Sequence, residues 1–305
     1  MTAAKKKNSR RKQARFRSSR RKRIRNTVLL LLLLVVLGGT GIGAIYVLRN
    51  GTVFDKLEDA YVASREFSGG ITDLDSLRAD GFAKNLCVVV SDVPMDGVSL
   101  GENQKGLLLD LDDRKVLYSK QALQKVYPAS ITKIMTLLLI FESIEQGKCK
   151  LEDKVTVSEY AASMGGSQVF LEPGETQDVN TMIKCISIAS ANDAAVAMAE
   201  HLAGSEQSFV KRMNKKAKAL GMKHTHFKNC NGLDDSIESG HYSSAYDVAL
   251  MSQSLVSKYP DISKYSTVWM DAITHITKKG KKKFGLTNTN KLIRTYQGIT
   301  GLSTD

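Results

Sequence analysis

The chain has 305 residues and a formal net charge of +13, from 44 Lys and Arg against 31 Asp and Glu, and this length allows one or two domains. Residues 1–26 contain thirteen Lys and Arg and no acid, so the remainder of the chain carries no net charge. The basic charge therefore belongs to a tail, and it gives no reason to expect a nucleic-acid-binding body.

Residues 27–48 follow this tail as an uncharged and mainly apolar run. At ~1.5 Å per residue, such a helix spans roughly 30 Å, which is enough to cross a bilayer. The positive residues before it favour a cytoplasmic N-terminus, so we expect a single-pass signal-anchor at the cell membrane with the rest of the chain outside. A cleaved signal peptide is the alternative, with small residues at 41–44, but the apolar run continues past them and favours a retained anchor.

The basic tail, residues 1–26, has three interpretations. Its positive charge is sufficient to set the orientation of the chain in the membrane, and it is also compatible with binding to anionic membrane lipid. Nucleic-acid binding is disfavoured, because the tail is tethered at a membrane and has no aromatic residue besides Phe16 to interleave with bases. We therefore expect membrane lipid, and no nucleic acid, as a partner of this region.

Residues 49–100 are of mixed polarity and are predicted to be an extracytoplasmic spacer, with a helix near residues 57–65 and a short strand at 87–90. A folded domain is predicted for residues 101–305. It opens with a β-hairpin, in which residues 107–111 and 115–119 flank a turn at Asp112-Asp113-Arg114.

A helix with a polar start and an apolar body follows the hairpin. Pro128 suits a helix entry, and residues 134–141 are apolar almost all round, which predicts a helix buried in a core. Ser130 and Lys133 are three residues apart on its first turn, so the amine can reach the hydroxyl. A serine becomes a good nucleophile when a neighbouring base takes its proton, and burial can make a lysine such a base. We therefore predict Ser130 as nucleophile and Lys133 as its base.

This Ser-x-x-Lys pattern is weak when taken alone. It also occurs at Ser9 and Ser19 in the basic tail, and at Ser208 on an amphipathic helix. A helix N-cap serine followed by an exposed lysine explains it equally well. The position of Ser130 at the start of a buried helix favours the catalytic interpretation.

The remaining pattern mixes helices with late strands. An extended run is predicted at 154–158, a glycine-containing loop at 165–167 and a turn at 172–175. Helices are predicted at 179–187, 194–203, 209–220 and 245–258, and two strands within 273–286. This order predicts an α+β fold, with a cluster of helices packed against an antiparallel sheet.

The cysteines and histidines give no sign of a metal site. The four cysteines are Cys87, Cys149, Cys185 and Cys230. No two of them form a C-x-x-C pair, and none has the spacing to a histidine that is typical of metal ligands. Cys185 lies in an apolar run and is most simply a buried thiol, and a disulfide among the other three stays open. A Ser/His/Asp triad is the rival chemistry, but no G-x-S-x-G elbow supports it.

A second motif, Ser190-Ala191-Asn192, lies between two predicted helices. Alone it reads as a helix N-cap. Together with Ser130 and Lys133 it matches the first two of three motifs, Ser-x-x-Lys, Ser-x-Asn and Lys-Thr-Gly. From about Lys105 to Asp305 the chain resembles the low-molecular-mass penicillin-binding proteins, which are serine-type D-alanyl-D-alanine carboxypeptidases. Further stretches that carry the resemblance are 128–135, 164–167, 171–175, 189–195, 220–227, 240–245 and 288–292.

The resemblance implies the α+β fold of penicillin-binding proteins and β-lactamases. It also implies that Ser130 attacks the carbonyl between the two terminal D-alanines of a peptidoglycan stem peptide while Lys133 takes its proton. Ser190 then relays protons near the leaving group, and Asn192 holds the substrate amide and orients Lys133. The family works outside the cytoplasmic membrane, needs no metal or organic cofactor, and is acylated by β-lactams that mimic the substrate. The histidines are structural positions in the family.

The third motif departs from the family pattern, because residues 298–305 read Gly-Ile-Thr-Gly-Leu-Ser-Thr-Asp. Aligned without a gap, Ser303 stands in place of the lysine, Thr304 matches the substrate-binding threonine and Asp305 replaces the glycine. Alternatively, Lys-Thr-Gly is deleted and these residues follow it. We therefore expect a C-terminally incomplete domain that lacks the last strands of the sheet.

Two rivals to an active carboxypeptidase follow. A non-catalytic or vestigial cell-wall-binding member of the family fits the missing Lys-Thr-Gly motif. A class A β-lactamase shares the first two motifs, but it needs a Glu-x-x-Leu-Asn loop, which does not occur between Asn192 and Asp305.

Overall fold

The computed structural model describes residues 89, 91–111, 115–234, 239–277, 280–299 and 301–302. All of them belong to the second of two compact units, Gly69–Asp305. The predicted basic tail, the anchor at 27–48 and the spacer helix near 57–65 lie outside these residues. Among the described helices, none has the length and apolar character needed to cross a membrane.

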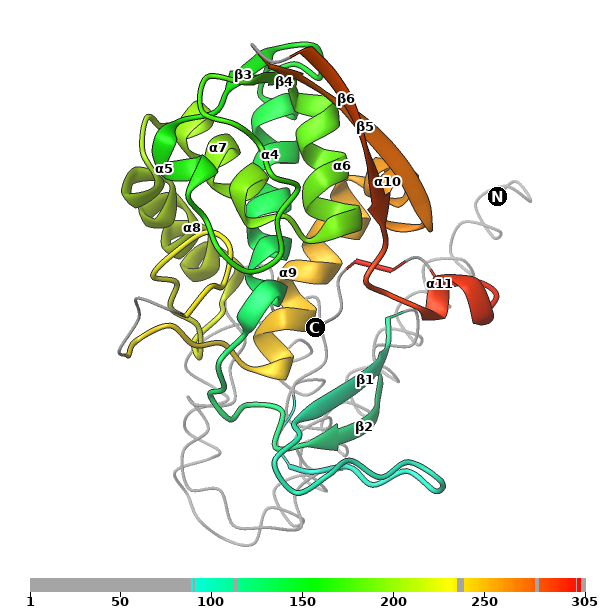
Figure 1. Cartoon of the computed structure of the whole chain (residues 1–305). Helices are drawn as coiled ribbons and strands as arrows, with labels where there is room; N and C mark the ends of the chain where they lie inside the picture. The colour runs from blue at the N-terminus through cyan, green and yellow to red at the C-terminus, as the bar shows by residue number, and fades with distance from the viewer. Residues whose placement is uncertain are drawn as a thin grey trace, which may run out of the picture. The chain divides into compact units, whose positions relative to one another are not determined.

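The fold is built around helix α4, Lys133–Glu145. Its body is buried on every side, with Met135, Leu138 and Ile140 fully inaccessible to solvent, which confirms the buried helix predicted at 134–141. An all-round apolar helix needs neighbours on all faces. Four other helices supply them, as Figure 1 shows: α6 (Val179–Ala189), α7 (Asn192–Ala203), α8 (Glu206–Leu220) and α9 (Ala245–Lys258).

These four helices confirm the helices predicted from the apolar periodicity. In α8 the buried residues Phe209, Met213, Ala217 and Leu220 recur every three or four positions, so one face packs on the core and the basic face meets solvent. Each helix differs from its prediction by at most three residues at either end. At α8 the earlier start arises from capping. The Ser205 hydroxyl accepts a hydrogen bond from a backbone N–H of the first turn and starts α8 at Glu206.

The described strands form three antiparallel pairs. They are β1 (Gly106–Asp110) with β2 (Lys115–Lys120), β3 (Lys154–Thr156) with β4 (Thr176–Asp178), and β5 (Met270–Thr277) with β6 (Gly280–Thr287). The two predicted hairpins are confirmed. The register of the last pair runs without a break from Met270 opposite Thr287 to Thr277 opposite Gly280.

The α+β class is confirmed, but the described strands do not join into one sheet. The β1–β2 hairpin packs on α9, whereas β5 and β6 lie along α6 (Figure 1). No described strand lies between the two hairpins and pairs with both, so the hairpins form separate two-stranded sheets. Val93 adds an isolated bridge to Ser119 of β2, which ties residues assigned to the spacer to the folded body.

Short elements complete the described fold and lie beside the longer ones. They are η3 (Ala129–Thr132), α5 (Glu159–Ala162), η4 (Pro260–Ile262), α10 (Ser263–Ser266) and α11 (Leu292–Thr295). The η3 turn leads directly into α4, and it therefore places residue 130 at the N-terminal end of the central helix.

Replacing Leu138 by alanine should lower the free energy of unfolding by about 2–5 kcal/mol, because removing this fully buried side chain leaves a cavity in the core. The matched control is Leu292→Ala, since Leu292 is 52% exposed and its loss should change the free energy by less than about 0.5 kcal/mol. Urea denaturation followed by circular dichroism measures both. Equal effects of the two substitutions would contradict the central position of α4.

Candidate active site

The first motif forms a hydrogen-bonded pair at the start of α4. Ser130 lies in the η3 turn and Lys133 is the first residue of α4. Their side chains meet with 2.8 Å between Lys133 Nζ and Ser130 Oγ. The Lys133 side chain is only 2% exposed, which is rare for a lysine and removes most of the water that would hydrate an ammonium group.

A second group holds the Lys133 amine in place. The amine donates a hydrogen bond to the Asn231 carbonyl oxygen at 2.8 Å. Two bonds fix the position of the nitrogen between the loop at 229–233 and Ser130. The Asn231 side chain is engaged as well, because its Oδ1 accepts the Leu233 backbone N–H at 2.8 Å. Lysine and loop therefore position each other.

The backbone before Ser130 is strained and closely packed. Ala129 has a φ of 42°, in the left-handed region that non-glycine residues seldom adopt. Gly232, itself at a φ of +86°, lies so close that a Cβ added there would fall 1.7 Å from the Ala129 carbonyl oxygen. The Tyr127 hydroxyl donates to the Gly232 carbonyl at 3.0 Å. Tyr127 and Gly232 thus clamp the turn that presents Ser130.

The second motif lies at the junction of α6 and α7. Ser190 ends α6 with a φ of 53°, and Asn192 begins α7. The Asn192 amide donates from Nδ2 to the Gly165 carbonyl at 2.8 Å. Its Oδ1 and the Ser190 Oγ are buried and make no hydrogen bond to any described residue. Buried polar atoms without partners are costly, which marks these two as groups that can serve a bound substrate.

A glycine loop connects the two motifs. A Cβ added at Gly166 would meet Asn192 Nδ2 at 2.9 Å and Leu233 Cδ1 at 3.2 Å. The Leu233 backbone N–H donates a hydrogen bond to Asn231 Oδ1, and the Asn231 carbonyl accepts one from the Lys133 amine. The structure therefore links Asn192 to Lys133 through packed loops.

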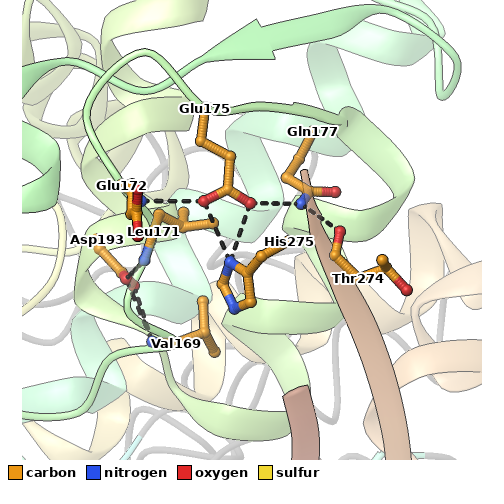
Figure 2. Close-up of polar contacts among 8 residues, drawn as sticks. All are labelled: Val169, Leu171, Glu172, Glu175, Gln177, Asp193, Thr274 and His275. Atoms are coloured by element: carbon orange, nitrogen blue, oxygen red, sulfur yellow. Dashed lines mark hydrogen bonds and ion pairs between the residues drawn. The ribbon is translucent and has the colours of Figure 1, made fainter. Parts of the chain in front are cut away.

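Two buried carboxylates anchor the segment that follows this loop, as Figure 2 shows. Asp193 accepts hydrogen bonds from the backbone N–H groups of Val169 and Leu171. Burial raises the pKa of Asp193, and these hydrogen bonds oppose the rise. Glu175 contacts the ring of His275 on β5, with 2.9 Å between Glu175 Oε1 and His275 Nδ1, and accepts a bond from Gln177. The loop is thereby fixed to both α7 and β5.

His241 supports the residue next to Lys133. Its Nδ1 accepts the Lys228 backbone N–H at 3.1 Å, so Nε2 carries the proton that it donates to Thr132 Oγ1 at 2.9 Å. Burial, with a smaller effect from His226, lowers the pKa of His241 to about 4. The imidazole is therefore neutral at physiological pH, and its two hydrogen bonds hold Thr132 against the Lys228 backbone.

The sequence predicts Ser130, Lys133, Ser190 and Asn192 as site residues, and the structure places the first pair at the start of α4 and the second at the α6–α7 junction. Thr304 lies outside the described residues, so its predicted contact with substrate stays a prediction. Sequence reasoning assigned no role to Asn231 and Gly232. Their Asn-Gly dipeptide is a turn signal, which was the available hint. Its contact with residue 129, about 100 positions earlier, could not be foreseen.

The chain is similar to a group of known proteins. A family model described as D-alanyl-D-alanine carboxypeptidase matches residues 101–305. The chain is 54% identical over 203 residues to D-alanyl-D-alanine carboxypeptidase DacF of Bacillus subtilis (strain 168), covering 67% of this chain and 50% of that protein. It is 40% identical over 171 residues to DacA of Escherichia coli (strain K12), covering 54% and 42% respectively. The chain thus spans about half the length of the curated relatives it matches.

Solved structures show the same fold. Penicillin-binding protein 6B from Escherichia coli aligns with a TM-score of 0.58 at 28% identity, over 70% of this chain and 67% of that one. Penicillin-binding protein D2 from Listeria monocytogenes, in its ampicillin-bound form, aligns with a TM-score of 0.53 at 28% identity, over 66% and 78%.

Replacing Gly232 by alanine should destabilise the chain by about 1–3 kcal/mol beyond the backbone strain alone, because the new Cβ collides with the Ala129 carbonyl. Gly174→Ala is the matched control, since Gly174 has a φ of +78° and nothing within 4 Å of an added Cβ. That control should cost only about 1 kcal/mol. Urea denaturation compares them, and equal losses would show that the Gly232–Ala129 contact is not tight.

The His241 imidazole should make stability fall in acid. Its folded pKa of about 4 lies below the ~6.5 of an unfolded histidine, so the unfolded chain binds the extra proton between these pH values. The contribution is complete above pH ~6.5 and is lost as pH falls towards about 4, amounting to about 3 kcal/mol. His241→Gln should flatten the slope between pH 7 and 4.5 in urea denaturation. An unchanged slope in His241→Gln would contradict the account.

Proposed function

This chain belongs to the D-alanyl-D-alanine carboxypeptidase family, and we propose that it removes the terminal D-alanine from peptidoglycan stem peptides through an acyl-enzyme on Ser130. The observation that carries this proposal is the 2.8 Å contact between the buried Lys133 amine and the Ser130 hydroxyl. A serine paired with a buried base is the arrangement that nucleophilic acyl transfer requires.

Acylation follows from the positions of these two groups. Ser130 Oγ attacks the carbonyl carbon between the two D-alanines, and its proton passes to the neutral Lys133 amine. The resulting tetrahedral intermediate collapses with cleavage of the amide bond. The departing D-alanine amine takes up the proton from Lys133 through the Ser190 hydroxyl. Water then attacks the ester and releases the shortened peptide with Ser130 restored. The Asn231 carbonyl stabilises the lysine while it carries the extra proton, because it already accepts a hydrogen bond from this nitrogen.

Substrate binding is assigned to the second motif and to Thr304. Asn192 Oδ1 is buried without a hydrogen bond from any described residue, so a substrate amide N–H can satisfy it. Asn192 Nδ2 donates a hydrogen bond to the Gly165 carbonyl, which fixes the orientation of the Asn192 side chain before substrate binds. Thr304, which lies outside the described residues, is proposed as a further substrate-binding residue because it matches the threonine of the family's third motif. A β-lactam carries a strained amide in the same position, so we propose that β-lactams acylate Ser130.

The proposed site of action is outside the cytoplasmic membrane. Residues 27–48 would anchor the chain as a single-pass helix, with residues 1–26 in the cytoplasm and on anionic lipid. Thirteen basic residues before the apolar run and none of the opposite charge support this orientation. Peptidoglycan lies on the side to which the folded domain would be exported.

Release of D-alanine tests the proposal. The full chain in detergent is incubated with a pentapeptide ending in D-Ala–D-Ala, and free D-alanine is measured. Ser130→Ala should lower kcat by on the order of 10⁴-fold or more, because the nucleophile is lost. Ser208→Ala is the matched control, since Ser208 heads another Ser-x-x-Lys sequence but lies exposed on α8. Its activity should equal that of the unaltered chain.

Equal D-alanine release by Ser130→Ala and the unaltered chain would refute the assignment of Ser130. A folded chain that releases no D-alanine, yet binds peptidoglycan, would refute the enzymatic proposal. The non-catalytic wall-binding role would then replace it.

A further inference from the structure

Three metal-binding side chains converge at a place remote from the Ser130–Lys133 pair. The Cys149 sulfur, a carboxylate oxygen of Asp153 and a ring nitrogen of His201 all lie within 4.8 Å of one another. These residues are 4 and 48 positions apart in sequence, which explains why their spacing gave no metal signature. We propose that they form a three-ligand site for a divalent transition metal, with zinc as the metal that suits it best.

The fold builds this cluster from three elements. Cys149 lies just after α4, beyond a turn in which Gly147 has a φ of +67°. Asp153 immediately precedes β3, and His201 lies in the last turn of α7. Cys149 is 2% exposed, Asp153 is half-buried and His201 is exposed, so the cluster runs from the core to the surface. A metal can therefore enter from solvent and still reach a sheltered sulfur.

Asp153 is held in position without losing its ability to bind a metal. Its Oδ2 accepts the Lys150 backbone N–H at 2.8 Å, and its own carbonyl accepts the Val179 N–H at 3.1 Å. The carboxylate is thus tied to the loop before β3, and the Asp153 backbone is tied to the start of α6. Hydrogen bonds of this kind orient ligating carboxylates in known metal sites.

The donor set selects among metals. Sulfur and imidazole ligands favour zinc and related transition metals, whereas magnesium and calcium prefer oxygen ligands throughout. Three protein ligands would leave the fourth tetrahedral position to water on the exposed side of His201. A thiolate and a carboxylate together balance a charge of +2. A cysteine binds a metal as the thiolate, so binding has to release the thiol proton of Cys149.

The position of the cluster points to a structural clamp. Helix α4 begins at Lys133 and α7 begins at Asn192, so both catalytic motifs stand at helix N-termini. Cys149 follows the other end of α4, and His201 lies near the other end of α7. The 13 residues of α4 span roughly 20 Å, which separates the metal site from Ser130. Since α4 and α7 pack together, a metal would tie their far ends. It would stabilise the pair of helices without taking part in acyl transfer.

Metal binding to the full chain in detergent tests the proposal. The chain is treated with a chelator and a thiol reductant, freed of both, and titrated with zinc and separately with cobalt. We expect one equivalent of zinc, a higher melting temperature with zinc, and a sulfur-to-cobalt charge-transfer absorption that reports a Cys149 thiolate. These readouts do not depend on carboxypeptidase activity, so the two proposals fail independently.

Two variants and one control make the outcome specific. Cys149→Ser should abolish the charge-transfer absorption. His201→Asn changes an exposed residue. It should weaken zinc binding by roughly 10–100-fold or more, because the loss of a residue that only orients a metal ligand already costs that much and His201 is a ligand itself. His224→Asn removes a histidine elsewhere and should bind zinc like the unaltered chain. The proposal is overturned if zinc does not bind, or if His201→Asn binds it with unchanged affinity.

Discussion

The site depends on one constraint, which is the burial of the Lys133 amine between the Ser130 hydroxyl and the Asn231 carbonyl. A lysine with 2% exposure is tolerated only when its polar atoms have partners. The central helix α4, the loop at 229–233 and the strained Ala129 turn can be understood as the supports of this nitrogen. Asn192 joins the arrangement through Gly166 and Leu233.

Much of the fold was predictable because local patterns determined it. The apolar run of α4 and the amphipathic repeat of α8 are consequences of burial and appear directly in the sequence, and turn residues marked both hairpins. The separation of β1–β2 from β5–β6 was not predictable, since it depends on which helix each hairpin packs against. Sequence periodicity identifies the buried face of a strand, but it does not identify the neighbour that covers it.

The candidate site was predictable to the extent that its residues lie close in sequence. Ser130 and Lys133 share one turn, and Ser190 and Asn192 share another, so motif spacing captured each pair. Asn231, Gly232 and the Cys149–Asp153–His201 cluster act through contacts between distant segments, and only the folded chain reveals them. The sequence motifs drew attention to the N-terminal ends of α4 and α7 alone, whereas the Cys149–Asp153–His201 cluster lies at their other ends.

The most direct test of the central claim is the acylation rate of Ser130 with and without the buried amine. The full chain in detergent and its Lys133→Ala variant are incubated with penicillin, digested and analysed by mass spectrometry over time. The account predicts a single adduct on the peptide containing Ser130, formed on the order of 10²–10⁴-fold more slowly in the variant, because the general base is lost. Equal rates in the two proteins, or an adduct on another serine of the folded chain, would contradict it.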